Sequence, residues 1–261
     1  MAQTGTELQS PLPSGNLVFQ MARRDIDVLF RTPWIIISRG LAFIIQLFVF
    51  ARLISPLVSY PDFFPYYAVG SIISMVASIS FIIGYDIFEE AEEGVLDYLL
   101  TLPVSRRQFI IGRALGGAIR ALIYVIPMFA VVAILEGFAQ PASLLAAIGY
   151  LFLLAFGVTG LSITVAVSVR SANRFDVFLA LMELAIVRAS TALYPISSMP
   201  SYVASIAPYS PVSFASNGAR SLLLGPGLDV STLAGLLAFV VVFLGLGAAF
   251  YFRKLEGGVY A

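Results

Sequence analysis

Residues 89–115 read EEAEEGVLDYLLTLPVSRRQFIIGRAL and lie between two long apolar runs. The stretch opens with four glutamates in five residues, continues with leucines near helical spacing, and reaches Pro103. Ser105 is a residue type that caps helix N-termini, and Arg106 and Arg107 follow it. The pattern predicts a charged amphipathic helix, a turn, and the start of another apolar helix. Because apolar runs flank it, we expect this helix to lie beneath a membrane and to face a cytoplasmic partner.

The composition is that of a membrane protein with several spans. The chain has 261 residues, of which 59% are hydrophobic and 11% charged, and its mean hydropathy is +0.94. These values exclude an ordinary soluble domain. Residues 1–14 lack a basic segment followed by an apolar core, so we expect no cleavable signal peptide and assign the insertion signal to the first span.

Missing residue types exclude several chemistries. The chain has no Cys and no His, which removes disulfides, thiolate chemistry, the usual zinc sites and His-based triads. Its only lysine is Lys254, preceded by Arg253. A Walker A loop needs Gly-Lys, since that lysine reaches the phosphates of the nucleotide. The chain therefore carries no P-loop of its own, and any ATP it uses is bound by another polypeptide.

Hydropathy predicts an all-α polytopic membrane protein with six transmembrane helices. The spans are expected at about 34–55, 64–85, 108–135, 143–169, 175–193 and 230–252. Before them, residues 16–31 place apolar side chains on one face and arginines on the other, which favours a helix in the membrane interface over a soluble packing helix. We expect short outer helices before span six. Residues 1–15 are interpreted as a flexible tail and residues 16–261 as a single transmembrane domain.

The distribution of cations predicts the orientation. With six spans, nine cations fall on one side: Arg23, Arg24, Arg31, Arg106, Arg107, Arg170, Arg174, Arg253 and Lys254. The opposite loops hold Asp62, Glu136, Asp229 and only Arg220. By the positive-inside rule both termini are cytoplasmic, in a multi-pass protein of the plasma membrane. Span five contains two charges, each costing about 2.5–3.5 kcal/mol at a helix centre, but omitting it would put Arg253 and Lys254 outside.

We call residues 89–115 the organising stretch. Its glutamates have three possible interpretations. They form a docking face, a solvated face or a metal cluster, in that order of preference, because nothing in the sequence shows the converging oxygens that a metal needs. Glu93 is the preferred docking or elbow contact. Arg106 and Arg107 either pair with it or bind anionic lipid.

Ionisable residues within the spans form a second candidate site. Arg120, Glu183 and Arg188 lie where a charge is expensive unless it faces a bundle interior or a wet cavity. A structural ion pair would join Glu183 to Arg120 or to its rival Arg188. The functional alternative is a lining of the substrate route or of a subunit interface.

The organising stretch resembles the permease subunits of type-2 ABC exporters. Those proteins carry a pattern of the form E-x-G-T-L-x-x-L-L-x-x-P-V-S-R, followed by Gly-Lys in the next helix. Here Val95 replaces the usual Thr, and Arg113 stands where Lys is common. The resemblance extends to the six-span layout, the amphipathic N-terminal helix and the proline-rich segment before the last span.

The resemblance implies two permease subunits, identical or different, above two ABC ATPase subunits. It makes the stretch after span two a coupling helix that docks on the ATPase. Its expected contact residues are Glu89, Glu90, Glu93, Gly94, Leu96, Leu99, Leu100, Pro103, Arg106 and Arg107. ATP and magnesium belong to the partner ATPase, and this chain holds no cofactor or metal. The remaining partners are membrane lipids, with no nucleic acid.

The expected function is therefore that of an export permease without catalytic residues. An intramembrane enzyme is the first alternative, and it would need paired acids or a Ser–Lys dyad. Lys254 lies at a membrane edge and Glu183 is essentially the only acid within a span, which disfavours that reading. A non-transporting anchor or sensor is the second alternative, and a coupling helix would have no role in it.

Overall fold

The computed structural model describes residues 23, 26, 33–57, 62–93, 106–169 and 171–256. All regular secondary structure in these residues is helical, which confirms the predicted all-α class. In chain order the elements are α2 (Pro33–Ile54), η1 (Ser55–Leu57), α3 (Phe63–Glu92), α5 (Arg106–Leu135), α6 (Pro141–Ser168), α7 (Ala172–Glu183), η2 (Leu184–Arg188), η3 (Ile196–Ser198), α8 (Ser201–Ala204), η4 (Ala207–Tyr209), α9 (Pro211–Leu223) and α10 (Val230–Glu256).

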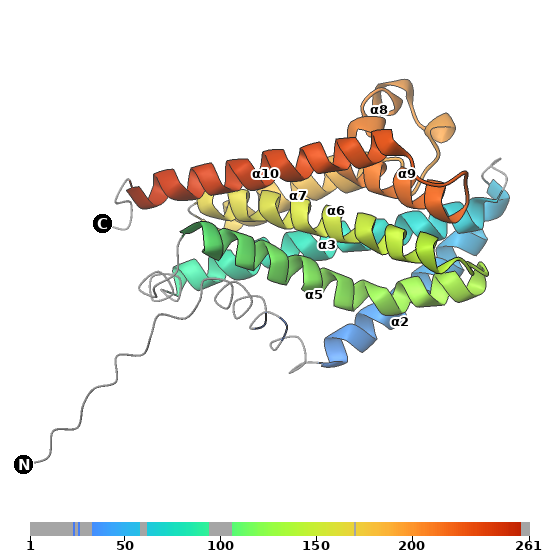
Figure 1. Ribbon diagram of the computed structural model, residues 1–261, viewed down its shortest axis with the longest axis horizontal. Helices are drawn as coiled ribbons and strands as arrows, with labels where there is room; N and C mark the ends of the chain where they lie inside the picture. Colours follow the sequence, from blue (N-terminus) through green and yellow to red (C-terminus); the bar gives the residue numbers. More distant parts are fainter. Residues whose placement is uncertain are drawn as a thin grey trace, which may run out of the picture.

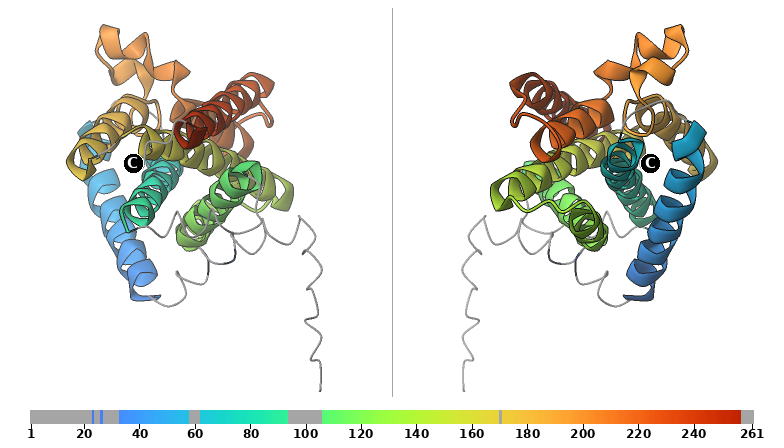
Figure 2. Two further views of the ribbon diagram at one scale, coloured as in Figure 1. Left: turned by 90° about the vertical axis from the view of Figure 1, so that its left-hand side faces the viewer. Right: turned by 90° about the vertical axis from the view of Figure 1, so that its right-hand side faces the viewer.

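The long helices form an elongated bundle (Figure 1). Helices α3, α6 and α10 run in one direction, and α5 and α7 run in the other. We call the end where α3 stops and α5 starts the joint end, and the end where α3, α6 and α10 start the far end. Helix α10 also ends at the joint end (Figure 1). Views along the bundle show α3 enclosed by α2, α5 and α6 (Figure 2).

Small residues allow the central helices to pack closely. In α6, Gly157 lies against Phe239 and Gly160 against Leu244, both on α10. A glycine at such a crossing lets two backbones approach, as is typical of helix packing in membranes. Helix α3 is the most enclosed, since 82% of its apolar stretch is buried, compared with 22% for α10. The core therefore centres on α3 and α6.

Among the described residues, four helices are long and apolar enough to cross a membrane. They are Phe63–Glu90, Gln108–Leu135, Pro141–Ala166 and Val230–Gly247. These correspond to predicted spans two, three, four and six. In the expected first span, α2 contains a shorter apolar stretch at Gly40–Ala51.

The expected fifth span has different bounds in the structure. Helix α7 starts at Ala172, continues as the π-helix η2, and ends at Arg188 rather than Leu193. Residues after it form turns, in which the Ser190 hydroxyl donates to the Val187 carbonyl and accepts from the backbone N–H of Ala192. This side chain supplies the local bonds that a continued helix would need, so the helix stops early.

The start of the organising stretch also differs from the prediction. The sequence predicts that span two ends at Tyr85 and that a separate helix starts at Glu89. Helix α3 instead continues without a break to Glu92. Of the expected interfacial helix 16–31, only Arg23 and Ile26 lie among the described residues, and both are helical.

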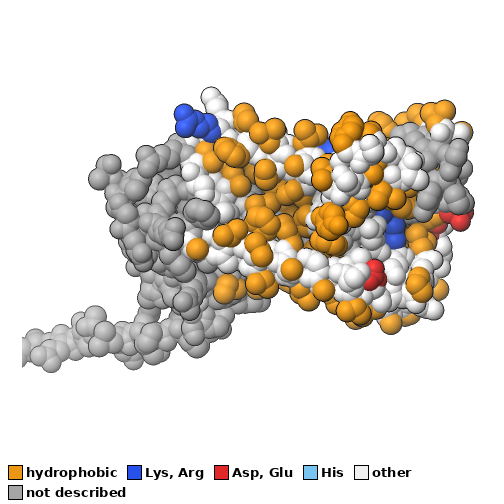
Figure 3. All heavy atoms as spheres, turned by 90° about the horizontal axis from the view of Figure 1, so that it is seen from above, with side chains coloured by type: hydrophobic (Ala, Val, Ile, Leu, Met, Phe, Trp, Pro, Cys, Tyr) orange, Lys and Arg blue, Asp and Glu red, His pale blue; other side chains and the backbone are white. Residues whose placement is uncertain are grey.

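The proline-rich segment before α10 folds into the predicted short helices. Elements η3, α8 and η4 project sideways near the far end (Figures 1 and 2), whereas α9 is largely buried against α3, α6 and α10. Exposed Tyr202 and Tyr209 belong to the projecting part. Hydrophobic side chains cover much of the surface along the bundle (Figure 3), as a bilayer requires.

We predict that Gly84→Ala destabilises the bundle. A Cβ atom there would overlap the Ser162 hydroxyl and lie 2.8 Å from the Ser162 carbonyl carbon, which is backbone of α6. Such overpacking costs about 1–3 kcal/mol. The measurement is the thermal unfolding midpoint in detergent. Gly149→Ala is the control, because a Cβ atom at that α6 position meets nothing within 4 Å. Equal midpoints for the two variants would contradict the prediction.

Candidate functional site

Two ion pairs connect α3 to α5 at the joint end. The Arg113 guanidinium lies 3.1 Å from a Glu90 carboxylate oxygen, and 3% of the Arg113 side chain is exposed. One helical turn back along α3, Arg120 lies 2.5 Å from Asp86. The two helices run in opposite directions, so the acids advance along α3 as the arginines step back along α5. We call these two pairs the α3–α5 ladder.

An apolar cluster packs beside the ladder. Phe88, which lies between the two acids on α3, stacks on Phe175 of α7 with ring centroids 5.0 Å apart. Phe109 and Ile110 of α5 belong to the same buried cluster, as does Ile163 of α6. The joint end therefore has its own small core, to which four helices contribute.

Some of the predicted coupling residues lie among the described residues and others lie outside them. Glu89 and Glu93 are exposed, whereas Glu90 is half-buried in the ladder. Arg106 and Arg107 form the first turn of α5, but their side chains lie outside the description. The remaining expected contacts lie outside the described residues: Gly94, Leu96, Leu99, Leu100 and Pro103.

Of the two ion pairs predicted for Glu183, the structure contains the one with Arg188 and not the one with Arg120. Arg120 binds Asp86, so it does not form the Arg120–Glu183 pair. Glu183 instead lies 3.6 Å from Arg188 and accepts a hydrogen bond of 3.1 Å from Ser78 on α3. These two charges sit at opposite ends of the π-turn η2, and the amide of Ala189 donates to the Leu184 carbonyl in the i→i+5 pattern of such a turn.

The pair on α7 is open to the surroundings. In this chain the side chain of Arg188 is 55% exposed and that of Glu183 is 37% exposed. Their neighbours Leu181 and Leu184 are also exposed. A partly exposed ion pair on an otherwise apolar face is unusual for a helix that packs against hydrocarbon.

Arg220 forms a site that sequence reasoning missed. It lies in the last turn of α9 and is 8% exposed. Its guanidinium donates to the carbonyls of Tyr66 (3.0 and 3.2 Å), Thr191 (3.0 Å) and Ala192, and it stacks 3.5 Å from the Tyr66 ring centroid. It thereby ties α9 to the start of α3 and to the turn after η2. The available signal is that Arg220 is the only charged residue between Arg188 and Asp229.

Acidic residues lie at the far end, outside the long spans. Burial raises the pKa of the Glu136 carboxyl, and the negative charge of Asp62 raises it further. Ser231 lowers the pKa of Asp229, because its hydroxyl and backbone N–H both donate to the carboxylate, at 2.7 and 2.9 Å. That second arrangement caps the N-terminus of α10. The pKa shifts of both carboxyls therefore have local structural causes.

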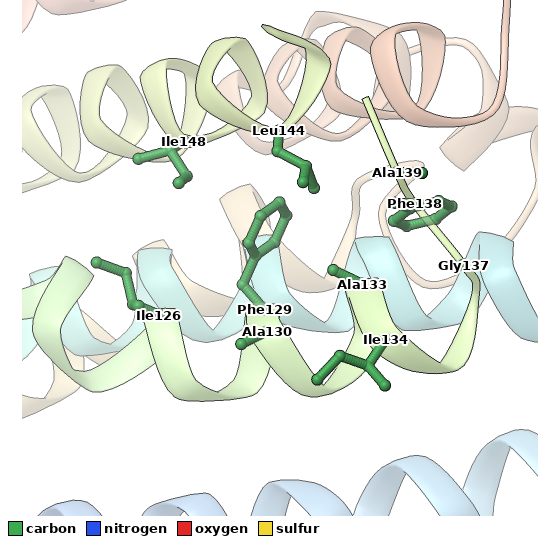
Figure 4. Close-up of a pocket in the computed structure, with 10 residues that line it drawn as sticks. All are labelled: Ile126, Phe129, Ala130, Ala133, Ile134, Gly137, Phe138, Ala139, Leu144 and Ile148. Atoms are coloured by element: carbon green, nitrogen blue, oxygen red, sulfur yellow. The ribbon is translucent and has the colours of Figure 1, made fainter. Parts of the chain in front are cut away.

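A pocket of about 560 Å³ lies between α5 and α6 near the far end. Phe129 of α5 points toward Leu144 of α6, and the turn carrying Phe138 and Ala139 closes one end (Figure 4). Its lining side chains are hydrophobic throughout. The pocket therefore offers no group for acid–base, nucleophilic or metal chemistry. Within the described ranges, no cluster of three or more metal-ligating side chains occurs either.

Residues 16–224 match the family described as ABC-2 type transporter. The chain belongs to this family. No curated protein matches the sequence. Membership makes the chain an ABC transporter membrane permease with transmembrane helices, in a family that lacks catalytic motifs. The apolar pocket and the ion pairs of this ABC-2 permease are therefore features of a transport subunit.

We predict that Arg220→Met destabilises the permease. The substitution removes the buried hydrogen bonds that the guanidinium donates to the carbonyls of Tyr66, Thr191 and Ala192, and a hydrogen bond from a charged group contributes about 1.5–3 kcal/mol. The Thr191 carbonyl keeps the hydrogen bond from the Tyr66 hydroxyl. The measurement is the unfolding midpoint in detergent. Arg174→Met on α7 is the control, because Arg174 is exposed. A midpoint for Arg220→Met as high as that of the control would show that the buried contacts do not stabilise the fold.

Proposed function

We propose that this ABC-2 permease is the membrane-spanning subunit of an exporter driven by a separate ABC ATPase. Permeases of this family generally pair with ATPase subunits. The lack of a Gly-Lys phosphate loop supports a division of labour in which ATP and magnesium are held by the partner. The resemblance of residues 89–107 to type-2 exporters supports outward transport and assigns the coupling role to this stretch.

The observation that carries the proposal is the exposed Glu183–Arg188 pair. Hydrocarbon does not solvate charges, so a pair at this position in a span needs protein or water beside it. A second permease subunit, identical or different, would cover the α7 face, or an aqueous substrate route would run along it. Either arrangement fits a dimeric transporter and disfavours a monomeric anchor surrounded by lipid.

The proposed topology has six spans, with both termini in the cytoplasm. Helix α7 has 12 residues and η2 has 5. The 17 residues together correspond to about 26 Å of helix. A hydrocarbon core is about 30 Å thick, so this segment nearly crosses it. The cation bias toward the joint end supports a cytoplasmic location for that end. In this proposal residues 16–261 act as one permease domain in the plasma membrane.

We predict that the tagged full-length chain, purified in mild detergent from its own host, brings with it an ATPase carrying Walker A and B motifs. Replacing residues 94–102 by a Gly-Ser linker of the same length should abolish ATPase binding, because the proposed docking contacts are removed. The measurement is mass spectrometry of the purified complex together with its ATP turnover.

A matched disruption at the opposite end serves as the control for that experiment. Replacing residues 225–228, between α9 and α10, by a Gly-Ser linker should leave ATPase binding intact. An ATPase that remains bound and coupled to the 94–102 variant would contradict the assigned docking segment.

A second prediction concerns the α7 face. The chain has no native cysteine, so a single introduced cysteine reports without background. We expect Leu184→Cys to form a disulfide with a second permease chain or to react with a water-soluble maleimide in membranes, because its face is covered by protein or wet. Val241→Cys on α10 is the control, with a comparably exposed side chain on a face expected to meet lipid. An inert Leu184→Cys would show that α7 faces lipid.

A further inference from the structure

We propose that the α3–α5 ladder is the rigid joint through which force from the ATPase enters the membrane domain, with Arg113 and Arg120 as its positioning residues. This inference rests on the proposed function, because it concerns how the segment between α3 and α5 transmits work. It adds residues and a mechanism that the coupling segment alone does not supply.

The first support is where the ladder lies. Glu90 is two residues from the end of α3, and Arg113 is seven residues after the start of α5. The two helices that lead into and out of residues 93–105 are therefore connected to each other close to the helix ends that this segment joins. A push on the segment reaches α3 and α5 together rather than either helix alone.

The second support is the burial of the Arg113–Glu90 pair. The Arg113 side chain is 3% exposed and that of its partner Glu90 is 16% exposed. Removing one partner from such a pair leaves an uncompensated charge in a medium that does not solvate it. The contact therefore resists separation far more than a solvated surface pair would.

The third support is the spacing of the two pairs. Asp86 and Glu90 are one turn apart on α3, while Arg120 and Arg113 are two turns apart on α5. Sliding one helix along the other by a turn would move both arginines away from their present carboxylates. The ladder thus favours one register and opposes shear between α3 and α5.

Helix α3, which carries the acids of the ladder, also contacts α7. Phe88 stacks on Phe175 of α7, and farther along α3 Ser78 donates to Glu183. Helix α3 therefore contacts α7 at two levels, one beside the ladder and one at the exposed ion pair. A displacement of the locked α3–α5 unit would move the element that carries Glu183 and Arg188. A contiguous chain of packed and hydrogen-bonded side chains of this kind can carry a displacement from one site to another.

The test compares Glu90→Gln with Asp176→Asn in the full chain, together with its co-purified ATPase in lipid nanodiscs. Asp176 is an exposed acid in the first turns of α7, outside the ladder and outside the expected docking contacts, and provides the control. We expect both variants to retain the ATPase, since residues 94–102, the assigned docking segment, are unchanged. For Glu90→Gln the permease-dependent ATP turnover should change about two- to thirtyfold, the range for residues that carry coupling between sites. Asp176→Asn should match the wild type.

A second variant guards against misfolding. Glu90→Leu combined with Arg113→Met removes both charges of this pair together. Replacing a buried ion pair by apolar residues is often neutral for stability, so the double variant should fold. This double variant should bind the ATPase but show the same coupling defect, whereas the exchange Glu90→Arg with Arg113→Glu should restore coupling. Wild-type coupling in the Leu/Met double variant would overturn the proposal.

A distance measurement reads the joint directly, without the ATPase. Spin labels at Glu93→Cys and Ile111→Cys, both exposed positions, report the separation of α3 and α5 by pulsed electron resonance. The distribution should be narrow in the otherwise unchanged chain and broader when Glu90→Gln is added. Equal widths would overturn the rigid joint even if an ATPase co-purifies with the chain. A broader distribution in a chain with which no ATPase ever co-purifies would instead contradict the proposed function and leave the rigid joint standing.

Discussion

The inability of a bilayer to solvate charge is the constraint on which this structure depends. The long helices are surrounded by apolar side chains, and each ionisable group among them must find a partner inside the protein. Arg113 and Arg120 find carboxylates on α3, and Arg220 finds backbone carbonyls. The polar contacts therefore decide which helices are held together, while apolar packing supplies the bulk of the core.

These contacts connect the helices at both ends of the bundle and leave one ion pair exposed between them. At the joint end, α3 and α5 are connected by charge pairs and supported by the Phe88–Phe175 stack. At the far end, Arg220 fixes α9 against the start of α3. Between them, the Glu183–Arg188 pair remains open to the surroundings. In the proposed transporter, the connected helix ends would transmit displacement, and the open Glu183–Arg188 pair would meet a second subunit or the transported substrate.

Much of the architecture could be predicted from the sequence because hydropathy is a local property. Four apolar stretches are long enough to read as spans, and all four are helices in the structure. The end of the fifth span was harder to predict, because no apolar run marks it. The same segment contains Glu183, Arg188 and the turn-forming Ser190. The break expected after Tyr85 was wrong because the acids that suggested it continue α3 and pair with arginines on α5.

The sequence by itself determined the membrane class, the absence of a phosphate-binding loop and the resemblance carried by residues 89–107, because composition, residue types and motif order need no contacts. Only the tertiary structure decided which charge meets which. Asp86 and Arg120 are 34 positions apart, and the carbonyls that bind Arg220 come from two distant segments. A side chain's partner depends on how antiparallel helices are placed in register, and that register is fixed by packing between segments rather than by the residues beside it in the chain.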